Sequence, residues 1–302
     1  MNRARLIPVS GIGSDNEAEQ RATSAFLAVL CVVRDLSTDL LGPLGASKAL
    51  KATVETFVEP VFASDGRRIR PDGLIRVSYG SSTWASLVEV KTRTNPLNAD
   101  QINEYWDVAR HNGLNHVLTI SNEIAPLSGG HPTAGLRVRS NSPVGVSHLS
   151  WARILATALR LRDHKGVSDP EQAWILNELI RYLEHERSGA LAFDDMGEQW
   201  TAIRDGAKAG TLNRKCDGVD DTCARWDQLL QHIALTLGSA TGGNVVPVLA
   251  KPQREDPKRL FGKFGLVDGR IDVVGVGGGY ILELWSLTGP HMPKPGERFT
   301  VI

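Results

Sequence analysis

Glu89 and Lys91, separated by one residue, and Asp72, further upstream, have the side-chain types of a divalent-cation site. Residues two apart on a strand point to the same face, so Glu89 and Lys91 would lie side by side if this segment is extended. Carboxylate oxygens bind hard divalent cations such as Mg²⁺. Two carboxylates and an ammonium among apolar side chains are costly to hold without such a purpose. These three residues are therefore the candidates for chemistry.

A β-hairpin is the element that would bring Asp72 to the other two residues. The segment 74–77 is short and rich in β-branched residues, 79–82 has turn residues, and 87–91 is mostly apolar. If the two strands are neighbours, Asp72 near the start of one lies close to the end of the other. The alternative is an exposed hairpin that carries an ordinary surface cluster of Asp, Glu and Lys.

Pro71-Asp72 and Glu89-Val90-Lys91 resemble the motif of the PD-(D/E)xK nuclease superfamily. The resemblance implies a restriction-endonuclease-like core and a metal-dependent nuclease site. In such a site Asp72 and Glu89, together with the Val90 carbonyl, would hold Mg²⁺, for which Mn²⁺ could substitute. Lys91 would orient the attacking water or stabilise charge in the transition state.

Two other acid-x-Lys triplets occur in the chain, at 163–165 and 256–258. The first follows a helical pattern and precedes a glycine, which is typical of a helix end. The second contains a proline and lies in a charged segment. Only the triplet at 89–91 sits on an apolar strand and follows a Pro-Asp dipeptide, so it is the one that indicates a site.

A predicted helix from Asn98 to about Asn112 follows this strand and carries Gln101 and Tyr105 one turn apart. This Gln-x-x-x-Tyr is similar to the additional motif of the RecB-like branch of the superfamily. The resemblance implies that the helix packs beside the metal site and helps to position it or the DNA. Two structural interpretations remain open, because Gln101 could close a capping box and Tyr105 could simply belong to the core.

The first predicted helix begins at Ser14, where Ser14-x-x-Glu17 has the pattern of a capping box. An apolar stripe follows, and Glu19 lies at its edge. Many members of the superfamily bring an extra acidic residue from the first helix to the metal. The resemblance therefore makes Glu19 a candidate metal ligand, and a solvated flanking glutamate is the alternative.

Arg67, Arg68 and Arg70 stand immediately before Asp72, after a predicted edge strand at 56–62. The planar guanidinium suits phosphate contact, so these arginines are candidates for binding nucleic acid. A solvated basic loop would account for them equally well.

The order of the predicted elements is helix, three strands, helix, two strands and helix, over residues 14–162. This order predicts an α/β fold with a central mixed sheet flanked by helices. A break at 166–170 and a glycine-rich joint at 238–244 divide the chain into three parts: a nuclease-like domain (1–165), a helical segment (166–238) and a small β-rich C-terminal module (239–302). The strands expected in the last part are 245–249, 260–267, 270–276 and 280–285.

The composition excludes some partners. Lys plus Arg equals Asp plus Glu, at 34 each, so no global field attracts nucleic acid and any basic surface must be local. The longest apolar run, 25–33, is too short to span a bilayer, so no membrane partner is expected. Three cysteines provide no disulfide framework and fit a reducing cytoplasm.

The function that the resemblance implies is metal-dependent hydrolysis of phosphodiester bonds, with DNA favoured over RNA. The alternative is a non-catalytic protein of the same fold that binds nucleic acid or a protein partner. The C-terminal part is the expected place for a protein partner or for homo-oligomer contacts. Divalent-cation binding that depends on Asp72 separates the two functions, because only the catalytic site requires it.

Overall fold

The computed structural model describes residues 6–8, 14–64, 66–126, 130–137, 142–190, 193, 196–209, 211, 216–248, 269–274 and 281–284. The chain forms two compact units. The first comprises Met1–Glu123 and His131–Ala192, and the second comprises Ile124–Gly130 and Phe193–Ile302.

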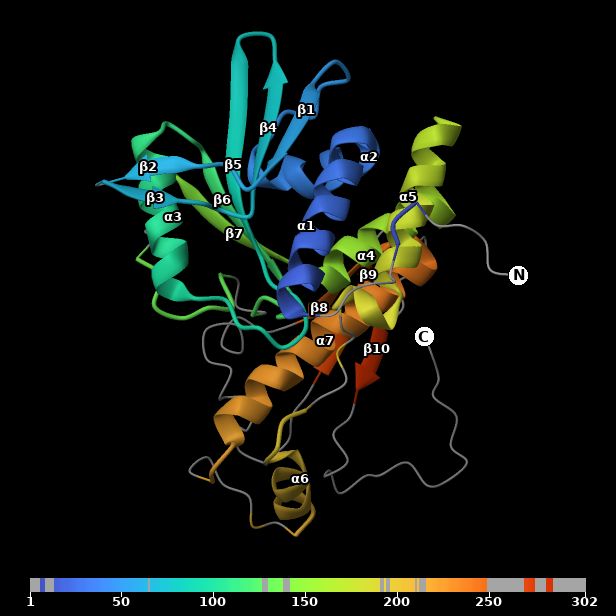
Figure 1. The fold of residues 1–302 in the computed structure, drawn as a ribbon. Helices are drawn as coiled ribbons and strands as arrows, with labels where there is room; N and C mark the ends of the chain where they lie inside the picture. Colours follow the sequence, from blue (N-terminus) through green and yellow to red (C-terminus); the bar gives the residue numbers. More distant parts are fainter. Residues whose placement is uncertain are drawn as a thin grey trace. The chain divides into compact units, whose positions relative to one another are not determined.

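The first unit is built on a five-stranded sheet in the order β1-β4-β5-β6-β7 (Figure 1). β4 runs antiparallel to both of its neighbours, β1 and β5, whereas β5, β6 and β7 run parallel to one another. The prediction of an α/β fold with a central mixed sheet is therefore confirmed. The strands are β1 (Thr53–Val58), β4 (Gly73–Tyr79), β5 (Ser82–Val90), β6 (His116–Ser121) and β7 (Gly145–Ser150).

The predicted hairpin is formed by β4 and β5. Tyr79 pairs with Ser82, so the connection has two residues, and the first of them, Gly80, has a positive φ of 59°. Two-residue hairpin turns require such a backbone conformation, and glycine adopts it without a steric penalty. The turn therefore sets the register that places the two ends of the hairpin side by side.

Helices cover both faces of this sheet. Helices α1 (Asp15–Val32), α2 (Arg34–Leu41), α4 (Trp151–Arg160) and α5 (Pro170–Leu183) share one hydrophobic core with Val88 and Val90 of β5. Helix α3 (Ala99–His111) shares a second core with Leu87 on the opposite face. The two faces of β5 thus alternate as predicted, because successive side chains of a strand point in opposite directions. Three short helical turns complete the unit: η1 (Gly42–Leu44), η2 (Leu161–Lys165) and η3 (Glu186–Ser188).

Helix α1 begins with the predicted capping box. The Ser14 hydroxyl accepts from the Glu17 main-chain N–H at 3.3 Å, and the Glu17 carboxylate accepts from the Ser14 N–H at 3.2 Å. Two donors at the helix start are thereby satisfied. Downstream, Phe26 and Leu30 are fully buried against the sheet.

The strand predicted at 56–62 is interrupted. β1 ends at Val58, Glu59 has a left-handed backbone (φ 49°), and Pro60 offers no N–H for pairing. A separate two-stranded hairpin follows, made of β2 (Phe62–Ser64) and β3 (Arg67–Ile69). The segments that lead into and out of this hairpin, residues 59–61 and 70–72, are called here its neck. They are joined by a hydrogen bond of 2.9 Å from the Glu59 N–H to the Asp72 carbonyl.

The first unit continues beyond the predicted boundary at residue 165. Leu176, Leu179 and Ile180 of α5 are buried in the same core as α1 and α4. These shared contacts make α5 part of the layer that covers this face of the sheet. The predicted domain of residues 1–165 therefore stops short of the compact unit, which extends to Ala192.

In the second unit, α6 (Trp200–Lys208) and α7 (Val219–Thr241) precede a three-stranded antiparallel sheet of order β10-β9-β8. Its strands are β8 (Asn244–Val248), β9 (Gly269–Val274) and β10 (Ile281–Leu284), which overlap three of the four predicted strands. The fourth, at 260–267, lies outside the described residues. None of the helices described combines the length and the apolar composition needed to cross a membrane.

We predict that α5 contributes to the stability of the first unit. Leu179→Ala should lower the free energy of unfolding by about 2–5 kcal/mol, because Leu179 is fully buried and truncation leaves a cavity. Trp174→Ala on the same helix is the control, since Trp174 is 55% exposed and its loss should cost about 1 kcal/mol or less. Urea denaturation of the full-length variants measures both values. Equal effects would mean that α5 does not pack as described.

Candidate active site

The strand register aligns polar residues in a row near the carboxyl ends of the parallel strands. Glu89 on β5 pairs with Thr119 on β6, and Thr119 pairs with His148 on β7. Asp72 immediately precedes β4, whose first residue pairs with the residue before Glu89. Partners in register on neighbouring strands share a face, so the row crosses the face of the sheet that α3 covers. The carboxyl ends of parallel strands are a common place for binding sites in α/β folds.

Asp72 reaches across the hairpin to β5. Its Oδ2 accepts a hydrogen bond of 2.8 Å from the Val90 N–H. Burial raises the pKa of Asp72, while the Val90 hydrogen bond and the Lys91 ammonium act in the opposite direction. The structure thus brings the aspartate to the Glu-x-Lys segment. The Val90 N–H donates to Asp72. The role of the Val90 carbonyl in metal binding stays a prediction.

Glu89 is the most buried acidic residue of the site, with 1% exposure. Its Oε1 lies 2.9 Å from Lys91 Nζ, yet neither oxygen accepts a hydrogen bond of good geometry from the described residues. Burial and the neighbouring Asp72 raise the pKa of Glu89 to about 7. A buried carboxyl group with open acceptor positions is unfavourable by itself, and a ligand that contacts its oxygens would relieve this.

Lys91 is held at both its side chain and its main chain. Its Nζ lies 2.9 Å from Glu89 Oε1 and 3.5 Å from Glu19 Oε1. Burial lowers the pKa of Lys91, but the surrounding carboxylates outweigh burial and the net shift is upward. In the main chain, the Lys91 N–H donates to the Ile120 carbonyl at 2.7 Å, and Trp151 Nε1–H donates to the Lys91 carbonyl at 2.9 Å. The ammonium is therefore a fixed positive charge.

Glu19 of α1 lies at the site. Besides its contact with Lys91, its Oε2 accepts from Asn95 Nδ2 at 3.2 Å, and its side chain is only 16% exposed. Of the two interpretations of this residue, the structure supports the one that brings it to the Glu-x-Lys segment. Its role as a metal ligand stays a prediction, because the contact that the structure shows is with the Lys91 ammonium.

Gln101 and Tyr105 interact with each other and with the segment before Asp72. Gln101 Nε2 donates to the Tyr105 hydroxyl at 2.9 Å, and this hydroxyl donates to the Arg70 carbonyl at 3.4 Å. Asn98 caps α3 by accepting from the Gln101 N–H, but the Gln101 side chain does not return that bond. Tyr105 is both a core residue and a neighbour of Glu89, and burial raises the pKa of its hydroxyl.

The three predicted phosphate-binding arginines are exposed on the β2–β3 hairpin and its neck. Arg67 forms an ion pair with Glu104 at 3.3 Å, and Arg70 forms one with Glu59 at 3.5 Å. The structure therefore does not place them in the buried carboxylate cluster. Exposed ion pairs of this kind contribute little to stability, so breaking either pair would cost little, and phosphate binding by the three arginines stays a prediction.

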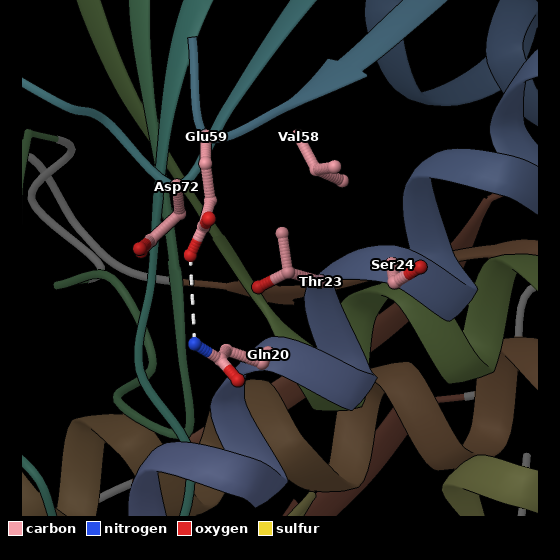
Figure 2. Close-up of a pocket in the computed structure, with 6 residues that line it drawn as sticks. All are labelled: Gln20, Thr23, Ser24, Val58, Glu59 and Asp72. Carbon is pink, nitrogen blue, oxygen red and sulfur yellow. Dashed lines mark hydrogen bonds between the residues drawn. The ribbon is translucent and has the colours of Figure 1, made fainter. Parts of the chain in front are cut away.

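A cleft of about 220 Å³ opens beside Asp72, between α1 and the end of β1 (Figure 2). Figure 2 shows the Glu59 carboxylate directed at Gln20, whose amide donates to it at 3.5 Å. Polar and apolar surfaces both line the cleft, and Asp72 forms part of its wall. The lining residues are Gln20, Thr23, Ser24, Val58, Glu59 and Asp72.

The donor set fits a hard divalent cation better than a transition metal. Asp72 and Glu89 offer carboxylate oxygens, and the open acceptor positions on the buried Glu89 are the observation that supports a cation there. In the parts of the chain that are described, no group of three or more His, Cys, Asp or Glu side chains is arranged to hold a metal ion. A cation here would therefore depend on these two carboxylates and on water.

Several residues that support the site were not found from the sequence. Trp151 and Asn95 hold Lys91 and Glu19 through single hydrogen bonds. Neither residue belongs to a motif, and each contact joins elements far apart in the chain. Only the tertiary packing makes these pairs neighbours.

No protein-family model matches this chain, and no curated protein is similar to it in sequence. The site is therefore defined by the geometry of the chain's own residues.

We predict that the site binds Mg²⁺ or Mn²⁺ in a way that depends on the charge of Asp72. At about 100 times the dissociation constant, the cation should stabilise the native protein by about 2.7 kcal/mol. Asp72→Asn should abolish this shift while keeping an acceptor oxygen for the Val90 N–H. Thermal unfolding with each cation and with EDTA measures this cation-dependent stabilisation.

Glu55→Gln is the matched control for that experiment, because Glu55 is an exposed carboxylate of the same sheet that pairs with Arg76 at 3.6 Å. It should keep the full cation-dependent shift. A full shift in Asp72→Asn would show that the cation binds elsewhere.

Proposed function

We propose that this chain is a metal-dependent nuclease that hydrolyses phosphodiester bonds, with DNA favoured over RNA as substrate. The observation that supports it best is the convergence of Asp72, Glu89 and Lys91 at the end of β5, with the buried oxygens of Glu89 accepting no hydrogen bond of good geometry from the described residues. These are the residues that resemble the PD-(D/E)xK motif. Gln101, Tyr105 and Glu19, which carry the rest of the resemblance, lie around them.

Asp72 and Glu89 would hold Mg²⁺, or Mn²⁺ as a substitute, with the Val90 carbonyl as a further oxygen donor. The bound cation would lower the pKa of a water molecule and neutralise charge on the scissile phosphate. Glu89 reaches the site from β5, and Asp72, just before β4, is held by the Val90 N–H, so both positions are set before the substrate arrives.

Lys91 provides the fixed positive charge. Its ammonium contacts Glu89 and Glu19 and is anchored through its main chain to Ile120 and Trp151. In this position it would orient the attacking water or stabilise the negative charge that develops on the phosphate. Preorganised charges of this kind act most strongly where water is largely excluded, as at Glu89.

The substrate would contact the arginines of the β2–β3 hairpin. Arg67, Arg68 and Arg70 would bind backbone phosphates and thereby orient the nucleic acid without reading its sequence. The neck of this hairpin leads directly into Asp72, and the Tyr105 hydroxyl holds it at the Arg70 carbonyl. Binding at the arginines is thus linked through the chain to the metal-binding aspartate. A cytoplasmic location and a protein or oligomer contact through the C-terminal part complete the proposal.

One observation favours a second function. The short distance between Lys91 Nζ and Glu89 Oε1 lets the two charges neutralise each other without a cation. A non-catalytic protein that uses the same fold to bind nucleic acid or a protein partner needs no more than this. Cation binding and catalysis therefore separate the two functions.

Lys91→Ala should lose about a hundredfold in rate, since removal of a fixed charge that stabilises the transition state costs on the order of 3 kcal/mol. DNA binding should remain, because the arginines that would bind phosphate lie outside the carboxylate cluster. Plasmid nicking across a series of Mg²⁺ and Mn²⁺ concentrations, with EDTA as the blank, measures the rate.

Lys165→Ala is the matched control for this comparison, because Lys165 ends another acid-x-Lys triplet but pairs with Asp39 at the surface. It should cleave like the wild type. Equal rates in Lys91→Ala and wild type would assign the cleavage to another site or to a contaminant. No cleavage by the wild type with any metal or substrate would favour the non-catalytic binder.

Arg70→Ala should weaken DNA binding and reduce the slope of log K against log salt by about one, while leaving the rate at saturating DNA nearly unchanged. Arg76→Ala is the control, because it also breaks an exposed Arg–Glu pair, at 3.6 Å compared with 3.5 Å for Arg70. Fluorescence anisotropy at several salt concentrations measures the slope. The same slope in both variants would remove Arg70 from the DNA-binding surface.

A further inference from the structure

A hydroxyl group shared by two imidazoles lies in the same row as Glu89, and the proposed nuclease chemistry does not use it. Thr119 Oγ1 is 2.7 Å from His131 Nε2 and 2.9 Å from His148 Nδ1. The two rings meet edge to face with centroids 5.5 Å apart. Thr119 is fully buried and stands in register between Glu89 and His148.

The main chain determines which nitrogens carry protons. The Thr133 N–H donates to His131 Nδ1 at 3.0 Å, so Nδ1 is unprotonated and a neutral His131 carries its proton on Nε2. His148 Nε2 lies 2.7 Å from the Glu123 carbonyl, which can only accept, so this nitrogen is the donor. In a neutral His148, Nδ1 is then an acceptor.

These assignments give the hydrogen bonds one direction. His131 donates to the Thr119 hydroxyl, and His148 donates to the Glu123 carbonyl. The single hydroxyl proton of Thr119 has two acceptors, His148 Nδ1 at 2.9 Å and the Ser147 carbonyl at 3.4 Å, and the shorter contact assigns it to His148. Burial lowers the pKa of both imidazoles to about 4, which agrees with neutral rings at neutral pH. Every ring nitrogen is used, so the arrangement, called here the Thr119 chain, is fully satisfied.

The Thr119 chain ends on a residue that also contacts the loop after Lys91. The Glu123 carboxyl accepts a hydrogen bond from the Leu97 main chain, which opposes the upward effect of burial on its pKa. The preceding residue, Asn122, donates from Nδ2 to the Arg93 carbonyl at 2.8 Å. Residues 122 and 123 therefore hold the segment 93–97 at two points.

That segment needs support and contacts the site. Arg93 has a left-handed backbone (φ 55°), a conformation that a non-glycine residue keeps only when its surroundings enforce it. Two residues further on, Asn95 binds the Glu19 carboxylate that faces Lys91. The loop thus connects the Thr119 chain to the charges around the ammonium.

We propose that Thr119 is a positioning residue: its hydroxyl, held between His131 and His148, fixes Glu123 and through it the loop 93–97 that orders Glu19 and Lys91. The effect on catalysis rests on the proposed nuclease function, whereas the effect on the loop does not. The hydroxyl contacts neither substrate nor metal in this role. It acts through the hydrogen bonds that lead from Thr119 by way of His148 to Glu123.

The test compares Thr119→Val, which removes the hydroxyl at nearly constant shape, with Thr119→Ser, which restores it. Amide exchange of Leu97 is the direct measurement, because this N–H is held by Glu123. It should exchange at least tenfold faster in Thr119→Val and near the wild-type rate in Thr119→Ser. The nicking rate at saturating DNA should fall by about 10- to 100-fold in Thr119→Val, the usual effect of losing an outer hydrogen-bond partner, with the KM for DNA unchanged.

His148→Phe provides a second test if Thr119→Val does not fold, because it keeps an aromatic side chain but removes both ring nitrogens. It should accelerate Leu97 exchange to the same extent. Unchanged Leu97 exchange in the folded variants would overturn the proposal, and so would an unchanged nicking rate beside faster exchange. If the wild type does not cleave DNA at all, the nuclease function fails, and the exchange measurements alone decide whether Thr119 positions the loop.

Discussion

The contact between Glu89 and Lys91 at the end of β5 is the interaction on which the arrangement of this site depends. Burying a carboxylate is unfavourable unless an opposite charge accompanies it, and Lys91 Nζ lies 2.9 Å away. Even with this pair, neither oxygen of Glu89 accepts a hydrogen bond of good geometry from the residues that the structure describes. The surroundings of this pair must therefore be rigid enough to maintain an unsatisfied buried group, which is a general feature of sites that bind a ligand.

Rigidity comes from both faces of the sheet and from the loops at its end. Val88 and Val90 pack against α1 on one face, while the face that carries Glu89 packs against Tyr105 of α3. Asp72 is tied to the Val90 N–H and the Lys91 carbonyl to Trp151. The bond between Lys91 and Trp151 joins residues 60 positions apart in the chain, so the complete site forms only when the first unit is folded.

The sequence predicted much of this unit because its local rules and its tertiary structure agree. The capping box at Ser14, the turn at Gly80 and the alternation along β5 depend on neighbouring residues only, and all three are present. Two predictions differ from the structure, and only the second of them depends on contacts between elements far apart in the chain. Pro60 and the left-handed Glu59 split one expected strand into two, and α5 belongs to the first unit because its apolar face is buried against α1 and α4.

The sequence by itself determined which residues are the candidates for chemistry: an aspartate before one strand, a Glu-x-Lys at the end of the next, and a Gln-x-x-x-Tyr on the following helix. Spacing along strands and helices decides which side chains share a face, and this is a local property. Only the tertiary structure decided that Glu19 faces Lys91 and that Thr119 stands in register beside Glu89. Such contacts depend on the parallel pairing of β5 with β6 and on the docking of α1, which no local pattern encodes.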